Sequence, residues 1–387
     1  MVKQKVAGGA LLLLFCFFLS AEESHKIILD SSVFGIRLAD SDWGLFSTSS
    51  GEIDFSSRGN KDVKARFAIK AESGQLVSTN PVTYEQNLTG QPISSISIHY
   101  AYIKAKIPVT EEYDIRISAG KNAISWGSGA LFNSGNTAFS SISQSSNLLA
   151  VGTSVREDTA WYQSLYLPLS KYSFIEQLLI IPEKGMDSSH SPATIFPSPE
   201  KSIPAIRTYF KLGQLSTELS YLYNPSEKTH TPAITLQGNL LGDIYISAST
   251  SVKDDSIQLY NNLAISCGIF FLNPIEIGET ISLRLEALII PSASWQEETY
   301  NAGSTKYGLQ IYQEAIIAPT DRLSFILRSI TSPIDLSALI ITGTDFNLSQ
   351  NLHIYAFFSA QAGEKSDTYS IDKPAGIGLA AGLRYTF

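Results

Sequence analysis

The strongest constraint on the fold is an alternation of apolar and polar residues that recurs in stretches of about ten residues. Residues 63–70 read VKARFAIK, with apolar side chains at the odd positions and Lys or Arg at most of the even ones. Successive side chains of a strand point to opposite faces, so such a stretch has one apolar and one polar face. The alternating stretches predict an all-β chain and lie near residues 27–38, 63–70, 94–106, 115–118, 159–182, 203–223, 231–251, 258–271, 281–287, 304–317, 323–328, 335–360 and 375–387.

The length and charge of these stretches favour a membrane barrel over a soluble sandwich. A tilted membrane strand takes about 9–11 residues, whereas strands of globular proteins are most often about 5–6 residues long. The polar faces carry full charges in mid-strand, which a watery lumen permits. Only 17% of residues are charged, and 44% are hydrophobic. The net charge is −8, and an acidic chain is a poor nucleic-acid binder. We expect a transmembrane antiparallel β-barrel, with a soluble sandwich or solenoid as the alternative.

The first residues have the anatomy of an export signal. Lys3 and Lys5 precede a ten-residue apolar run at 10–19, followed by Ser20 and Ala21. This order is typical of a secretory signal peptide, and the run is too short for a membrane helix of about 20 residues. The sequence therefore predicts a cleaved signal peptide at 1–21 and a single β-barrel domain at 22–387.

The end of the sequence is a strand that closes on an aromatic residue. One face carries Ile377, Leu379, Ala381, Leu383, Tyr385 and Phe387. This ending resembles that of the bacterial outer-membrane β-barrel proteins, in which the terminal aromatic is part of the signal read by the barrel-insertion machinery. The resemblance implies an assembly signal at Tyr385 and Phe387, and outer-membrane lipids and the insertion machinery as partners.

A second stretch, GKNAISWGSGALFN at 120–133, is similar to a GK–x–x–I–x–WG–x–G–x–x–FN pattern of porin-like outer-membrane proteins. In the general porins a long loop folds inward and narrows the channel, so the resemblance implies an inward constriction loop at 127–158. An external loop is the alternative interpretation. The residues implied in the constriction are Trp126, Phe132, Asn133, Arg156, Glu157 and Asp158.

The turns give a strand count. Eight short connections rich in Gly, Pro, Asn and Asp alternate with longer loops, near 73–93, 127–158, 183–202, 291–303 and 361–374. Outer-membrane barrels have short periplasmic turns, longer outer loops and an even number of strands. Eight periplasmic turns predict about 18 strands, within a range of 14–18. The eight connections are 57–61, 108–113, 168–172, 212–214, 241–243, 273–278, 319–321 and 349–351.

Alternation also assigns the residues of the lumen. Cations outnumber anions at the inward positions, and rings of Arg and Lys favour anions. The alternative is cross-strand pairing with Glu52, Asp54 and Asp114 around a wide, weakly selective pore. The candidate pore-lining residues are Lys64, Arg66, Lys70, Arg116, Arg207, Arg284, Glu286, Arg328, Arg384, Asp54 and Asp114.

Catalytic signals are weak. No pair of the five His has metal-ligand spacing, so we expect neither a metal nor a cofactor and no enzyme. The sequence favours a porin-like channel for passive diffusion of small hydrophilic solutes, mildly anion-favouring, which could be a homo-oligomer. Two alternatives stay open: a transporter of hydrophobic compounds, similar to the fatty-acid transporters, and an adhesin or structural barrel that acts through its loops.

Overall fold

The computed structural model describes most of the chain. The described residues are 23–37, 43–57, 61–74, 77–79, 86–88, 93–138, 148, 159–182, 199–240, 242–254, 259, 262–274, 279–295, 308–373 and 376–387. The predicted signal peptide lies outside them.

Eighteen antiparallel strands form a closed barrel within the described residues, as the even strand count predicts. The barrel strands are β1 (Glu23–Arg37), β2 (Trp43–Ser57), β3 (Val63–Gly74), β6 (Ile93–Pro108), β7 (Asp114–Ala123), β8 (Thr159–Ser170), β9 (Ser173–Ile181), β10 (Ile203–Leu212), β11 (Leu215–Asn224), β12 (Thr229–Asn239), β13 (Asp243–Ser249), β15 (Ala264–Pro274), β16 (Thr280–Ile289), β17 (Leu309–Ala318), β18 (Leu323–Ser332), β19 (Ser337–Ser349), β20 (Leu352–Ala362) and β21 (Ile377–Thr386).

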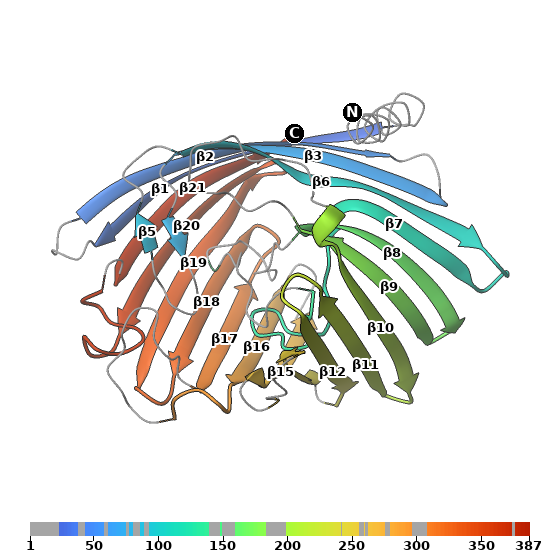
Figure 1. Ribbon diagram of the computed structural model, residues 1–387. Helices are drawn as coiled ribbons and strands as arrows, with labels where there is room; N and C mark the ends of the chain where they lie inside the picture. Colours follow the sequence, from blue (N-terminus) through green and yellow to red (C-terminus); the bar gives the residue numbers. More distant parts are fainter. Residues whose placement is uncertain are drawn as a thin grey trace.

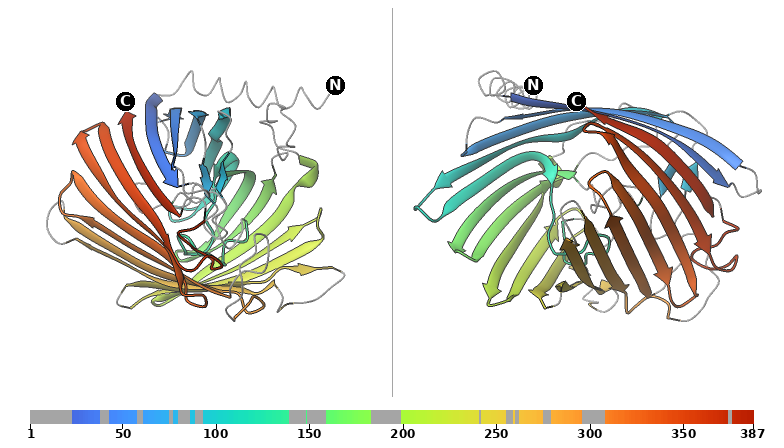
Figure 2. Two further views of the ribbon diagram at one scale, coloured as in Figure 1. Left: turned by 90° about the vertical axis from the view of Figure 1, so that its left-hand side faces the viewer. Right: turned by 180° about the vertical axis from the view of Figure 1, so that it is seen from behind.

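Each strand pairs with its neighbours in chain order, and β1 pairs with both β2 and β21 to close the ring (Figures 1 and 2). Closure gives each of these eighteen strands a neighbour on both sides, which is the condition for a sheet to stand in lipid. Three short elements lie outside the ring: β4 (Val77–Thr79) pairs with β5 (Gln86–Leu88), and β14 (Val252–Lys253) pairs with β12. A 3-10 turn, η1 (Pro199–Lys201), precedes β10.

The connections differ in length at the two ends of the barrel. The eight predicted short turns fall between β2 and β3, β6 and β7, β8 and β9, β10 and β11, β12 and β13, β15 and β16, β17 and β18, and β19 and β20, each with five residues or fewer. We call this the short-turn end. The five predicted longer loops fall at the opposite end, which we call the long-loop end. The turns were predictable because each one interrupts an alternating stretch.

The strands present apolar side chains outward and a mixed face inward. On β16, Leu283 and Leu285 are 44% and 48% exposed, whereas the alternate residues Ser282 and Glu286 are 3% and 1% exposed. The same contrast recurs around the ring, where exposed Leu, Ile and Phe form the outer surface. An outward apolar band around a polar interior is typical of outer-membrane barrels. No helix in the described part of the chain is long and apolar enough to span a membrane.

Candidate functional site

The segment that follows β7 turns inward and packs against the opposite wall of the barrel. We call residues 124–137 the inner segment; it appears as the teal trace inside the ring of strands in Figure 2. Its large side chains are fully buried: Trp126 is 1% exposed, and Leu131 and Phe132 are 0% exposed. A loop on the outer surface would keep such side chains in contact with solvent, so their burial reflects packing against the wall.

Glu286 of β16 holds the middle of the inner segment. Its carboxylate accepts hydrogen bonds from the backbone N–H groups of Ala130 (2.7 Å), Leu131 (2.9 Å) and Phe132 (2.9 Å). Three charge-assisted bonds satisfy donors that would otherwise be buried without partners. Tyr245 of β13 adds a bond from its hydroxyl to the Phe132 carbonyl (3.0 Å). Glu286 therefore positions the inner segment and has almost no exposure of its own.

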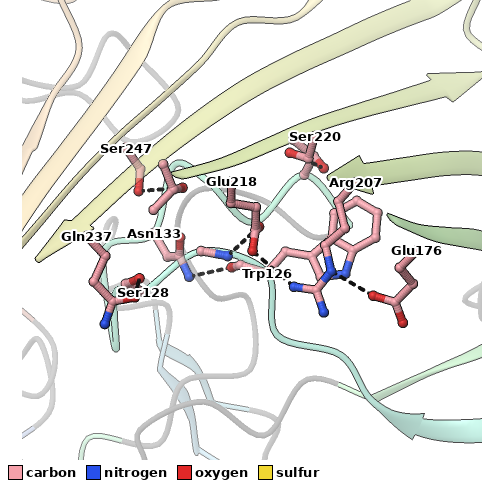
Figure 3. A network of polar contacts seen from close by, with 12 residues as sticks. Trp126, Ser128, Asn133, Glu176, Arg207, Glu218, Ser220, Gln237 and Ser247 are labelled. Carbon is pink, nitrogen blue, oxygen red and sulfur yellow. Dashed lines mark hydrogen bonds and ion pairs between the residues drawn. The ribbon is translucent and has the colours of Figure 1, made fainter. Parts of the chain in front are cut away.

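Further side chains along β11–β15 hold the two ends of the inner segment (Figure 3). The Gly127 N–H donates to Glu218 Oε1 (3.0 Å), and the Ser134 N–H donates to Ser266 Oγ (2.8 Å). Within the segment, Asn133 Nδ2 donates to the Trp126 carbonyl (2.8 Å), so the amide closes the turn on itself. Gly127 has φ = 72° and lies so close to Asn133 that an added Cβ would be 2.3 Å from its side-chain oxygen.

Arg207 of β10 is fixed between two carboxylates and two aromatic rings (Figure 3). Its guanidinium donates to Glu176 (2.6 Å) and to Glu218 (3.1 Å). The same group lies over the rings of Trp126 (5.4 Å) and Phe174 (5.2 Å), within cation–π distance. With two carboxylates around it, Arg207 contributes no net positive charge to the lumen.

The inward faces of β15–β21 form a packed wall. Tyr312, Leu339, and Tyr369 of the loop before β21 are 0% exposed and belong to one apolar cluster with Leu131 and Phe132. A buried ion pair crosses this wall: Arg328 of β18 donates to Glu314 of β17 (2.8 Å), with side-chain exposures of 1% and 0%. Arg328 also donates to the Leu148 carbonyl (2.6 Å), so the pair helps to hold the chain that follows the inner segment.

The loop that precedes β21 is fastened at the long-loop end of the packed wall. Asp335, in the turn between β18 and β19, accepts hydrogen bonds from the N–H of Thr368 (2.6 Å) and the hydroxyl of Ser337 (2.9 Å). Burial opposes ionisation of Asp335, but the hydrogen bonds from the Thr368 N–H and the Ser337 hydroxyl outweigh it and lower the pKa of this carboxyl. The carboxylate form therefore fastens the loop.

A group of exposed cations lies inside the barrel at the short-turn end. We call Lys64 of β3, Lys104 and Lys106 of β6, and Arg116 of β7 the cation cluster. Lys64 is opposite Lys104, and Lys106 is opposite Arg116, in the strand register. Among the described residues no carboxylate makes an ion pair with any of the four.

Aromatic rings border the cation cluster. Lys104 Nζ lies 4.7 Å from the Tyr102 ring, and the Arg116 guanidinium lies 4.8 Å from the Tyr166 ring. Tyr166 contacts Phe174 at 4.6 Å between ring centroids, and Phe174 stacks on Tyr209 at 5.1 Å. These rings continue the inward face from the cation cluster across β8, β9 and β10.

The structure pairs most of the cations that the sequence places inward. Arg66 donates to both oxygens of Asp54, and Lys70 contacts Glu72 (2.6 Å). Arg384 donates to Asp30 (2.8 Å), whereas Arg284 is 4.0 Å from Glu314 and lies over the Phe270 ring. Asp114 begins β7 opposite Pro108. Of the candidate pore-lining residues, Lys64 and Arg116 thus remain exposed and unpaired, while Glu286 and Arg328 are covered.

The residues implied by resemblance divide into three sets. Trp126, Phe132 and Asn133 lie in the inner segment. Arg156, Glu157 and Asp158 fall outside the described residues. At the last strand, Tyr385 and Phe387 make an edge-on ring contact of 4.3 Å, and Phe387 is 58% exposed.

Sequence reasoning missed Lys104, Lys106, Gln237 and Ser266. The two lysines alternate with Ile103, Ala105 and Ile107, so the alternation rule applied to residues 94–106 would have assigned them to the lumen. Gln237 accepts a hydrogen bond from Ser128 (3.0 Å), and no pattern in the sequence signals such a contact. Among the described residues, no group of three or more His, Cys, Asp or Glu could hold a metal ion.

Comparison with known proteins supports the architecture. No protein-family model matches the chain, and no curated protein matches its sequence. Among solved structures, OccAB3 of Acinetobacter baumannii and OccK7 of Pseudomonas aeruginosa each have a TM-score of 0.53 and 11% identity, with 95% of this chain and 99% of that chain covered. Both are outer-membrane porins. At such identity the likeness concerns the fold, and it confirms the predicted porin-like barrel at that level.

Proposed function

We propose that the protein is an outer-membrane channel through which small hydrophilic solutes diffuse passively. The observation that carries this proposal is the exposure of charged side chains inside a closed barrel: Lys64, Lys104 and Arg116 face inward and are solvent-exposed. A barrel of this strand number leaves an aqueous channel, and we assign the inner segment to one side of that channel. The likeness in fold to two outer-membrane porins supports the same function.

The outer apolar surface and the unequal ends support an orientation in the membrane. Short turns face the periplasm in outer-membrane barrels, so we assign the cation cluster to the periplasmic mouth. The inner segment then enters the barrel from its extracellular end.

We also assign an assembly role to Phe387, whose ring is exposed. Phe387→Ala should lower the fraction of heat-modifiable barrel recovered from outer membranes. Unchanged recovery would remove that role.

Conductance in planar bilayers tests the proposed function. Purified, folded protein should produce discrete current steps, because ions would pass through the proposed channel. The control is the same preparation after it has been heated until it migrates on a gel as the unfolded chain. A silent bilayer with folded protein would contradict the channel and favour a barrel that acts through its loops.

A modest preference for anions is part of the proposal. Among the inward cations of the described residues, Lys64, Lys104, Lys106 and Arg116 have no carboxylate partner and lie at one mouth. Arg66, Arg207 and Arg328 are neutralised by carboxylates. Replacing Lys64, Lys104 and Arg116 together by Gln should move the reversal potential in a KCl gradient toward that of a cation-favouring pore. An unmoved potential would show that the mouth does not control selectivity.

The packed interior disfavours a transporter of hydrophobic compounds. Such a path needs an open apolar surface, but the apolar cluster inside the barrel is dry: Tyr312, Leu339 and Tyr369 are 0% exposed. The wetted inward surface at the short-turn end is instead charged and aromatic. Passive passage of hydrophilic solutes is therefore the function that this arrangement supports best.

A further inference from the structure

The cation cluster contains an arrangement that costs folding free energy. Lys64 lies directly opposite Lys104, and Lys106 lies directly opposite Arg116, so two like-charged pairs face each other on three adjacent strands. Like charges directly opposite in a sheet are destabilising. Lys104 is in addition repelled by both Lys64 and Arg66. A fold that needed only a stable wall would place carboxylates among these positions, as β2 and β3 do with Asp54 and Arg66.

The described residues near the cluster include Glu176, Asp114 and Asp62, whose backbone carbonyl accepts a hydrogen bond from the Lys106 N–H. Glu176 attracts Lys104 at long range, but its carboxylate is bonded to Arg207 (2.6 Å). Asp114 shares the inward face of β7 with Arg116 but makes no ion pair within the described residues. None of the four cationic groups makes an ion pair with a carboxylate among the described residues, so an anion from solution can compensate their charge.

From this juxtaposition we propose a binding site for small oxyanions that carry two or more negative charges, such as sulfate, phosphate or dicarboxylates, at the short-turn mouth of the channel. Coulomb attraction grows with the charge of the bound ion, so a divalent oxyanion compensates a facing pair of cations in one binding event. The cations Lys64, Lys104, Lys106 and Arg116 supply N–H donors for the oxygen atoms, and Tyr102 and Tyr166 restrict the positions of Lys104 and Arg116 through ring contacts. This site rests on the proposed channel function and adds a solute class to it.

The test is block of single-channel current by sulfate in a KCl background of constant ionic strength. Sulfate should reduce the conductance of the full chain in a saturable manner, and monovalent nitrate should not. Because the site lies at one mouth, sulfate added from one side should block at lower concentration than sulfate added from the other. Equal block by sulfate and nitrate, or equal potency from the two sides, would overturn the site.

Variants locate the site. The double variant Lys64→Gln and Lys104→Gln should weaken the apparent sulfate affinity by on the order of tenfold, ~1.4 kcal/mol. The matched control is Lys365→Gln, an exposed lysine of the loop before β21, which should keep the affinity of the parent chain. A double variant that conducts and binds sulfate as tightly as the parent would overturn the assignment. If the double variant does not insert, the apparent sulfate affinity of the single variant Lys106→Gln is compared with that of the parent chain and of Lys365→Gln instead.

Failure of this inference is distinguishable from failure of the proposed function. A parent chain that gives no current steps contradicts the channel itself. Current steps that sulfate leaves unchanged retain the channel and remove the oxyanion site.

Discussion

The inward face of the barrel is built in two different ways. Along β15–β21 it is packed, with Tyr312, Ile330 and Leu339 covered by the inner segment and its neighbours. At the short-turn end of β3 and β6–β10 it is open, with exposed lysine and arginine side chains and half-buried aromatic ones. The contrast shows that the inner face of one closed sheet can carry both a packed core and an exposed, charged surface. Charges on the packed side hold structure together, whereas charges on the open side are available to solutes.

The sharpest test of this comparison replaces one arginine on each wall by the same residue. Arg328→Met should cost about 3–5 kcal/mol of stability, because it leaves Glu314 as a buried charge without its partner. Arg116→Met should stay within about 0.5 kcal/mol, as an exposed position allows. The free energy of unfolding of both variants is measured by urea titration, with gel mobility reporting the folded fraction. Equal losses for the two variants would mean that the walls do not differ as described.

A second, smaller effect is expected where the packed wall meets the inner segment. Glu286→Gln should cost about 1–3 kcal/mol, because an amide cannot accept all three backbone hydrogen bonds that the carboxylate accepts. The loosened segment should widen the passage, so single-channel conductance should rise. Glu227→Gln, in the exposed turn before β12, is the control and should change neither quantity. A lower conductance in Glu286→Gln would contradict the anchoring role.

The smallest effect concerns acid. The folded-state pKa of Asp335 is lowered, so its contribution is present above the ordinary Asp value of about 3.9 and is lost as the pH falls through the lower folded value. Hydrogen exchange of residues 363–373, corrected for intrinsic rates, should show weaker protection below about pH 4, by about 1 kcal/mol.

Asp335→Asn should make that protection nearly independent of pH in the acid range, and Asp372→Asn, an exposed position in the same loop, should retain the parent profile. Protection that falls equally in the parent chain and in Asp335→Asn would assign the acid response to another group.

The fold was predictable because lipid restricts what a strand can present. Residues such as Leu283 and Leu285 must face outward together, so alternation in the sequence marks both strands and turns. The eight short connections and the strand count follow directly from it. Trp126, Phe132 and Asn133 were assigned to an inward loop by resemblance, and the structure shows them buried against the wall.

The interior was less predictable, because alternation does not fix what lies opposite a residue. Ile326, Ile330 and Leu339 are apolar although they face inward, because the inner segment and the last loop pack over them. Alternation along a strand does not predict which inward residues another segment will bury. Pairing in the lumen depends on register, which shifts by one residue between Ala68 and Ile69. Such a bulge has no mark in the sequence, and it decides which charged groups meet.

The pairing of β1 with β21 also fixes the order of events in biogenesis. Ile28 pairs with Thr386 and Ile36 with Gly378, so the ring cannot be sealed before its final strand has been synthesised. Until then both terminal strands carry unpaired edges, which are templates for association with other chains. Contacts this distant in sequence also form slowly. The chain therefore needs protection from aggregation during the whole interval between translation and sealing, and its most vulnerable surface in that interval is the pair of strands that later closes it.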